Sequence, residues 1–374
     1  MGFRPFYLLA SAFAALSILL WVCQYTGHLP AIYVRNAAWH AHEMLYGYTL
    51  AVVAGFLLTA VGTWTRRPTP AGPPLMALAV LWVAGRLLVL TPYDVAAAVV
   101  DAAFPAAVAI AIGVPIVRSR NQRNYFFVAL LLLLALAVLA FHLAHLGLYP
   151  WPARASLRVG LDVILFIMVV VGGRVIPMFT NNGVPGARAT RHPAIESGAL
   201  GGVLVLLAAD LYEAPPVAIA VIALLVAAAH AARLALWQPW RTLGAPIVWV
   251  LHGAYGWIVV HLALRGLAAL ELVAAPLAVH SLAVGAIGGM TIGMMTRTAR
   301  GHTGRPLVAD RFDVASYGLV VIAAVLRVFG IMMLPGAYLP IIVASGICWT
   351  AAFAIFVVRY WPVLTRPRLD GKPG

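Results

Sequence analysis

Long apolar runs recur along the whole chain and restrict its fold more than any other feature of the sequence. Runs of about 18 or more apolar residues, enough for a helix to cross a bilayer, follow one another almost to the last residue. In hydrocarbon every backbone N–H and C=O needs a partner within the protein, and a helix supplies these partners within one segment. Because 63% of the residues are hydrophobic and only 10% are charged, the sequence predicts an all-α, polytopic integral membrane helical bundle.

The apolar runs are separated by short loops in which Pro, Gly and Arg cluster, as at Arg66-Arg67-Pro68 and Pro215-Pro216. These loops are too short to hold a soluble domain, so residues 1–374 are expected to form a single transmembrane domain of about twelve helices. The expected spans are 4–24, 39–63, 73–91, 93–117, 124–147, 156–180, 194–213, 215–237, 245–266, 270–297, 312–333 and 337–361.

The basic residues indicate an orientation rather than a nucleic-acid partner. The net charge is +14, but the arginines occupy short loops between apolar runs and do not form basic blocks interleaved with aromatic residues. Arginines are rare at one set of alternate helix ends, which holds only Arg35, Arg86, Arg154, Arg158 and Arg265. The other set is rich in them and includes Arg4, Arg66, Arg67, Arg118, Arg120, Arg123, Arg188, Arg191, Arg233, Arg241, Arg305, Arg368 and Lys372. The positive-inside rule therefore predicts that both termini are cytoplasmic.

The two cysteines do not form a site. Cys23 and Cys348 lie in separate apolar runs, so the chain has neither a disulfide framework nor a CxxC metal site. Any chemistry has to come from polar side chains on the membrane helices, where such groups are costly and by default functional.

The densest group of such side chains is Trp39-His40-Ala41-His42-Glu43-Met44, at the start of the second apolar run. Residues two apart on a helix point about 160° away from each other, so one metal ion cannot take both histidines without distorting the helix. His40 and His42 therefore serve different sites, or one ligates while the other supports. The alternative for Glu43 is that it only satisfies a helix N-terminus.

With the predicted orientation, six histidines share the depth of the outer leaflet: His40, His42, His142, His145, His261 and His280. Arg86, Asp101 and Asp162 fall in the same half of the membrane, where Arg86 and Asp101 can simply pair. A smaller inner group consists of Arg174, His252, Arg297 and His302, whereas His28, His192 and His230 lie in loops or at helix ends and are given no role. A single membrane histidine is usually a packing residue, but histidines on facing helices are how bundles hold haem or metal, and imidazole suits iron and copper.

A short sequence repeat relates two of the expected helices. Residues 172–180 and 288–296 share the pattern GGxxIxMxT, and the expected second helix also ends with Gly55 and Thr59 on the same side. One interpretation is that the bundle consists of three four-helix units. The other is that glycine and threonine recur because they allow membrane helices to pack closely.

Three segments together resemble the NnrS family: Trp39 to Gly47, Gly172 to Thr180, and Gly285 to Arg305, supported by Phe3-Arg4-Pro5-Phe6 and by Trp249 to Gly253. The resemblance covers residues 3 to about 311. It implies a bacterial inner-membrane protein that contains haem, of b type, and copper. It also implies a role in nitric oxide metabolism, in denitrification or in defence against nitrosative stress. The histidines in matched positions are His40, His42, His142, His252, His280 and His302.

The sequence and this resemblance lead to a hypothesis for the site. One of His40 and His42, together with His280, is expected to hold haem iron, and a second haem or a copper ion is expected to use the remaining histidines, with His142 first among them. Arg86 and Arg174 are expected to bind propionates or other anions, and His302 with Arg305 forms a further candidate anion site.

The expected function is binding of nitric oxide or iron-nitrosyl species, or electron transfer to them, within the lipid bilayer and with a quinone or cytochrome as electron donor. A nitric-oxide-reducing oxidoreductase is one form of this hypothesis. The alternatives are a transporter, and a haem or copper assembly factor without turnover.

Overall fold

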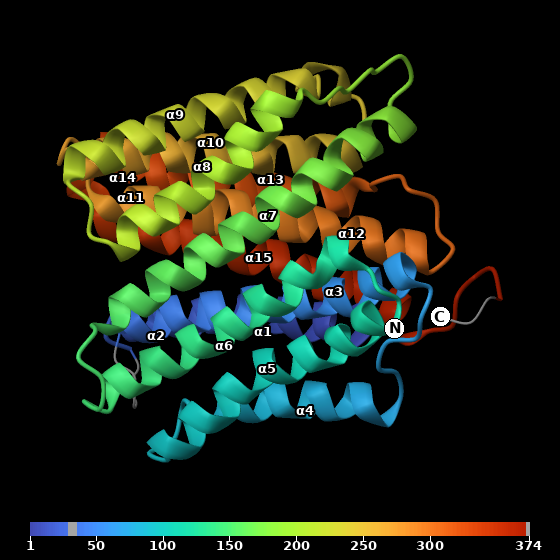
Figure 1. Cartoon of the computed structure of the whole chain (residues 1–374), viewed down its shortest axis with the longest axis horizontal. Coiled ribbons are helices and arrows are strands. Elements are labelled where there is room, and N and C mark those ends of the chain that lie inside the picture. The colour runs from blue at the N-terminus through green and yellow to red at the C-terminus, as the bar shows by residue number, and fades with distance from the viewer. Residues whose placement is uncertain (29–35, 372–374) are drawn as a thin grey trace. The chain divides into compact units, whose positions relative to one another are not determined.

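The computed structural model describes residues 1–28 and 36–371, and in these two ranges the regular structure is entirely helical (Figure 1). The predicted all-α class is therefore confirmed. Arg35 and Lys372, which contributed to the charge count, lie outside the described residues.

All twelve expected helices are present. The first six are α1 (Phe3–Tyr25), a continuous helix made of α2 (Asn36–His42), η1 (Glu43–Thr49) and α3 (Leu50–Thr65), then α4 (Pro73–Leu88), α5 (Asp94–Arg118), α6 (Tyr125–His145) preceded by the short turn η2 (Gln122–Asn124), and α7 (Ala153–Gly183). The last six are α8 (Pro193–Leu211), α9 (Pro216–Leu236), α10 (Pro246–Ala269), α11 (Ala275–His280) continued by η4 (Ser281–Gly288) and α12 (Gly289–His302), α13 (Arg311–Val325) continued by η5 (Leu326–Gly330) and α14 (Ile331–Met333), and α15 (Tyr338–Thr365). Two further short turns are η3 (Pro239–Thr242) and η6 (Pro335–Ala337).

Eleven of the described helices are long and apolar enough to span a membrane, which makes this a multi-pass membrane protein. The exception is α4, whose 16 residues extend only about 24 Å at 1.5 Å per residue. The sequence predicted α4 to reach residue 91, but it ends at Leu88 just before the Thr91-Pro92 turn, because a residue that precedes proline disfavours the helical conformation.

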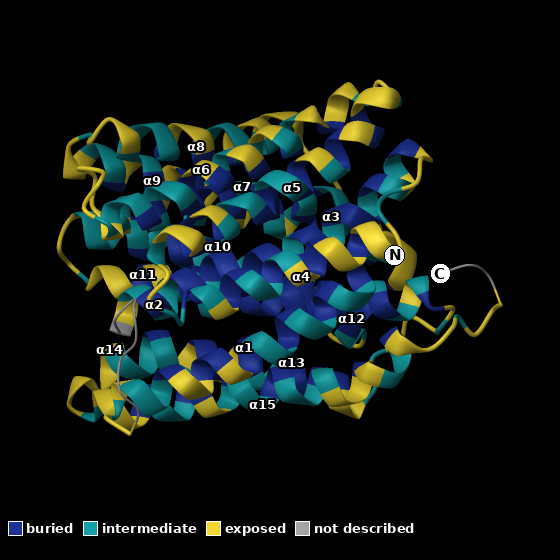
Figure 2. Cartoon of the chain, turned by 90° about the horizontal axis from the view of Figure 1, so that it is seen from below, coloured by how far each residue is buried: buried dark blue, intermediate teal, exposed yellow. Residues whose placement is uncertain are grey.

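The surfaces of the helices fit a lipid environment. Large apolar side chains in the middle of helices are exposed, among them Ile110, Leu136, Leu225 and Val358. Figure 2 shows buried and exposed residues alternating along individual helices. In water such a surface would favour aggregation, whereas in a bilayer the lipid chains cover it.

The contacts within the chain define two compact units. The first contains residues 1–163, 298–305 and 357–374, and the second contains residues 164–297 and 306–356. The expected single domain and the three four-helix units stay predictions. The short repeat corresponds to a shared hydrogen bond. Thr59, Thr180 and Thr296 each donate to the carbonyl four residues earlier, at 2.8, 2.9 and 2.8 Å.

Candidate metal centre

The centre of the first unit is a helix that changes its winding immediately after His42. From Glu43 to Thr49 the helix is π-helical, with Thr49 Oγ1 donating to the Met44 carbonyl five residues earlier at 2.7 Å. π-Helical turns insert one extra residue per turn and are frequent at functional sites. Within this turn Glu43, Tyr46 and Gly47 are buried.

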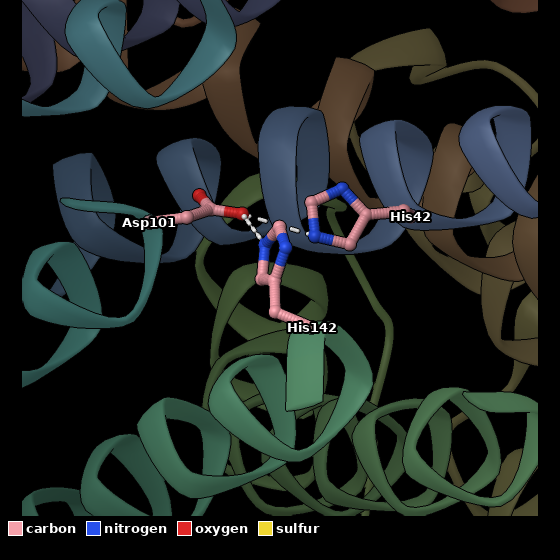
Figure 3. A group of neighbouring side chains, drawn as sticks. All are labelled: His42, Asp101 and His142. Atoms are coloured by element: carbon pink, nitrogen blue, oxygen red, sulfur yellow. Dashed lines mark hydrogen bonds and ion pairs between the residues drawn. The ribbon is translucent and has the colours of Figure 1, made fainter. Parts of the chain in front are cut away.

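Three helices bring His42, Asp101 and His142 together (Figure 3). Asp101 lies two turns from the start of α5 and His142 in the last turn of α6. The Asp101 Oδ2 atom is 3.0 Å from His42 Nε2 and 3.2 Å from His142 Nε2. All three residues are buried, and one ligand atom from each lies within 4.8 Å of the others.

Two further charged side chains complete the cluster. His42 Nδ1 is 2.8 Å from Glu43 Oε1, and Arg86 Nη1 donates to Glu43 Oε2 at 2.7 Å. Arg86 Nη2 donates to Asp101 Oδ1, so one guanidinium binds two carboxylates. The sequence interpretation that Arg86 and Asp101 can pair is therefore confirmed, and Arg86 reaches a second carboxylate as well.

The hydrogen bonds determine which nitrogen of His42 is available to a ligand. An ionised Glu43 can only accept, so Nδ1 of His42 carries the proton that it donates, and Nε2 keeps its lone pair. Within residues 1–28 and 36–371, His42 Nε2 is buried and lies 3.0 Å from Asp101 Oδ2 without a hydrogen bond assigned to it. A lone pair beside a carboxylate oxygen is electrostatically unfavourable, so this position favours a cation, either a proton on His42 Nε2 or a metal ion in its place.

The residues present fit a metal ion. Ligand atoms at about 2.0–2.1 Å from a tetrahedral ion are about 3.3 Å from each other, close to the 3.0 and 3.2 Å that join Asp101 Oδ2 to the two imidazoles. The His42–Glu43 hydrogen bond is the carboxylate–histidine arrangement that fixes the tautomer and orientation of metal-ligating histidines.

Close packing holds the cluster in place. The centroid of the His42 ring lies 4.5 Å from that of Phe141 and 5.3 Å from that of Tyr46. The Tyr46 hydroxyl donates to the Ser156 carbonyl at 2.7 Å. A Cβ atom at Gly47 would lie 2.7 Å from Arg86 Nη1 and 3.0 Å from Glu43 Oε2. A residue with a side chain at position 47 would therefore separate the guanidinium from Glu43.

The other predicted outer residues have different surroundings. His40 is not part of the His42–Asp101–His142 group and stacks on Trp21, with ring centroids 4.3 Å apart. That His40 and His42 serve different sites, or that one ligates while the other supports, stays a prediction. His280 lies in the second unit, where Nδ1 is 2.7 Å from the Pro276 carbonyl and Nε2 is 3.1 Å from Arg327 Nη2. The proposed sharing of one haem by a helix-2 histidine and His280 stays a prediction.

The predicted inner residues have different neighbours. His252 Nε2 is 2.8 Å from Thr180 Oγ1, and its buried Nδ1 atom has no hydrogen-bond partner within the described part of the chain. The carbonyl of Arg174 accepts from Arg191 at 3.0 Å. His302 is at the end of α12 in the first unit, with its ring 5.6 Å from that of Phe3.

A second buried polar cluster, in the second unit, was not expected from the sequence. Arg233 donates to Glu196 at 2.8 and 2.5 Å, to the Tyr255 hydroxyl at 2.8 Å and to the Val169 carbonyl at 3.0 Å. His230 Nδ1 is 2.6 Å from the same Tyr255 hydroxyl. The sequence predicts a cytoplasmic position for Arg233 and no role for His230. The sequence did not indicate this cluster, because both residues are near the end of α9 and periodicity does not show that their side chains turn inward.

The fold and the cluster define a class: a polytopic helical membrane protein with a buried His–Asp–His group able to bind a metal ion. A family model described as NnrS protein matches residues 1–368. The chain belongs to the NnrS family, as the motifs had indicated. No curated protein is similar enough in sequence to add a second comparison.

Proposed function

We propose that this protein binds copper at His42, Asp101 and His142 and uses it, together with haem, in nitric oxide metabolism. The observation that carries the proposal is the pair of buried imidazole nitrogens at 3.0 and 3.2 Å from one Asp101 oxygen. The link to nitric oxide, and to denitrification or nitrosative stress, rests on NnrS family membership. A bound metal with an open coordination position supplies a site for a small gas such as nitric oxide and for electron transfer to it.

The charge of the cluster favours a monovalent ion. Glu43 and Asp101 contribute two negative charges and Arg86 contributes one positive charge, so the cluster carries −1 with neutral imidazoles. A net charge buried in a membrane interior is unfavourable. One Cu⁺ ion would make the cluster neutral, whereas Zn²⁺ or Cu²⁺ would leave it at +1. Imidazole ligands suit copper, so we expect the site to prefer Cu⁺.

The protein's own residues have separate tasks in this proposal. His42, His142 and Asp101 hold the ion, Glu43 fixes the tautomer of His42, and Arg86 keeps both carboxylates in place. The surrounding Phe141 and Tyr46 rings exclude water from the site. Haem is expected to use the histidines outside this cluster, His40 and His280 first among them.

Metal analysis of the purified protein tests the copper site. The wild type is expected to contain about one copper ion per chain that His42→Ala, His142→Ala and Asp101→Asn each lose, because each removes one ligand. His192→Ala is the matched control, since His192 is exposed at the start of α8. Full copper content in all three variants would refute the site.

Optical spectra of the same preparations, oxidised and reduced with dithionite, test the haem separately. Haem bands that persist in the copper-free variants would place the two cofactors at different sites. Loss of the haem bands in His42→Ala, with copper retained, would instead assign His42 to haem iron.

A further inference from the structure

Three arginines gather in the first unit, where the ends of three segments meet. Arg4 begins α1, Arg305 follows α12, and Arg368 lies in the segment after α15. Arg368 Nη1 donates to the His302 carbonyl at 2.9 Å and the Leu369 N–H donates to the Thr303 carbonyl at 3.1 Å, so the segment after α15 lies beside the end of α12. Arg368 is paired with Asp370 at 2.6 and 2.8 Å. Within residues 1–28 and 36–371, neither Arg4 nor Arg305 has a carboxylate partner.

Two buried N–H groups of this basic cluster have no acceptor. Arg4 Nη1 donates to the carbonyls of Leu364 and Arg366 at 2.9 and 2.7 Å, but Arg4 Nε has no hydrogen-bond partner in the described chain. The same holds for Arg305 Nη1. Leaving buried guanidinium N–H groups unpaired is unfavourable, so both positions favour an anionic acceptor that does not belong to the protein.

An apolar groove begins at Arg4. It has a volume of about 340 Å³, and its lining comes from the first turns of α1 and α4 and from the last turn of α15. Its principal lining residues are Arg4, Leu8, Leu75, Met76, Ala79 and Leu364. Arg4 and Leu8 are one helical turn apart on α1, as are Leu75 and Ala79 on α4, so the groove runs from the charged end of the helices along their apolar sides.

We propose that this groove and the basic cluster bind one anionic phospholipid, with the phosphate at Arg4 and Arg305 and an acyl chain against Leu8, Leu75 and Ala79. A basic pocket at the end of membrane helices, continued by an apolar surface, is complementary to such a lipid in both charge and polarity. A peptide would bring backbone polar groups that this lining cannot satisfy. A neutral lipid would leave the arginines without a counter-charge.

Native mass spectrometry of the detergent-purified full chain tests the proposal, with phosphatidylglycerol and phosphatidylcholine of identical acyl chains as probes. Phosphatidylglycerol is expected to bind at least about fivefold more tightly than phosphatidylcholine, with a stoichiometry of one. Arg305→Gln is expected to weaken phosphatidylglycerol binding about fivefold, the factor for about 1 kcal/mol per basic side chain near an anionic surface. Arg305 is the better position to change than Arg4, because its side chain caps no helix.

Two further variants separate the parts of the site. Ala79→Leu narrows the groove and is expected to weaken phosphatidylglycerol binding while leaving all charges in place. Arg123→Gln is the charge-matched control, because Arg123 is exposed between α5 and α6 and belongs neither to the basic cluster nor to the lining of the groove. Its binding of phosphatidylglycerol is expected to equal that of the wild type.

Three results would overturn the proposal. Equal affinity for the two lipids would show a neutral-lipid or detergent groove. Equal losses in Arg123→Gln and Arg305→Gln would show diffuse attraction to the basic side of the protein. Inorganic phosphate that displaces the lipid at equal concentration would show that the groove does not contribute.

Discussion

Replacing Glu43 with Gln tests the copper site without removing a metal ligand. The amide oxygen of Gln can still accept the hydrogen bond that His42 Nδ1 now gives to Glu43 Oε1 at 2.8 Å. Arg86 keeps its bond to Asp101. What changes is the charge: the cluster of Glu43, Asp101 and Arg86 goes from −1 to 0, so that a bound Cu⁺ leaves it at +1 rather than neutral.

The size of the effect follows from the position of Glu43. Replacing a group that supports a metal ligand lowers metal affinity about 10- to 100-fold, or about 1.4–2.7 kcal/mol. Glu43 is only 1% exposed, so solvent screens the lost charge little and we expect a value near the upper end of this range. Competition with a chromophoric Cu⁺ chelator measures this affinity directly, at several chelator concentrations.

Glu196→Gln is the matched control. Glu196 also pairs with a buried arginine, Arg233, but it is not part of the His42–Asp101–His142 group. Its replacement should leave copper affinity unchanged while it lowers stability. Wild-type affinity in Glu43→Gln would refute the charge argument, and an equal loss in both variants would show a general effect of weakened packing.

Three other predictions concern the rest of the chain. Gly173→Ala should lower the free energy of unfolding of the purified protein by about 1–3 kcal/mol, because the new Cβ would lie 1.9 Å from Arg233 Nη2 and overpacking has costs of that order. A variant as stable as the wild type would show that the guanidinium moves freely. His280→Ala should lower the haem content per protein if His280 ligates haem iron, and an unchanged spectrum would exclude it. Reporter fusions after Arg123 and after Gly147 should report opposite sides of the membrane, cytoplasmic for Arg123, and results on the same side would refute the predicted orientation.

Much of the fold was predictable because a bilayer leaves few alternatives. All twelve helices appear where apolar runs had been expected, with ends differing by a few residues. The family was also predictable, since the segment from Trp39 to Gly47 and the two glycine-rich segments are specific in combination. Local signals of this kind are contained in neighbouring residues and need no knowledge of packing.

The composition of the candidate site was predictable only in part. Depth arguments placed His42, His142, Arg86 and Asp101 in the same leaflet, but they placed His261 and His280 there equally well. The structure gives these residues different partners, because the partners depend on which helices are neighbours. His261 bonds the Ala278 carbonyl at 2.7 Å, whereas His42 faces α5 and α6.

The sequence by itself determined that this chain crosses a membrane many times, that its chemistry depends on histidine and arginine in the helices, and which family it resembles. Only the tertiary structure decided that Asp101 joins His42 and His142, that Arg86 binds both Glu43 and Asp101, and that Arg233 turns inward to Tyr255. The physical reason is that periodicity and hydropathy record how deeply a residue lies in the bilayer and on which side of its own helix. The partners of that residue depend on the rotation and packing of helices that are distant in sequence, and on a π-helical turn after His42 that re-aims the side chains beyond it.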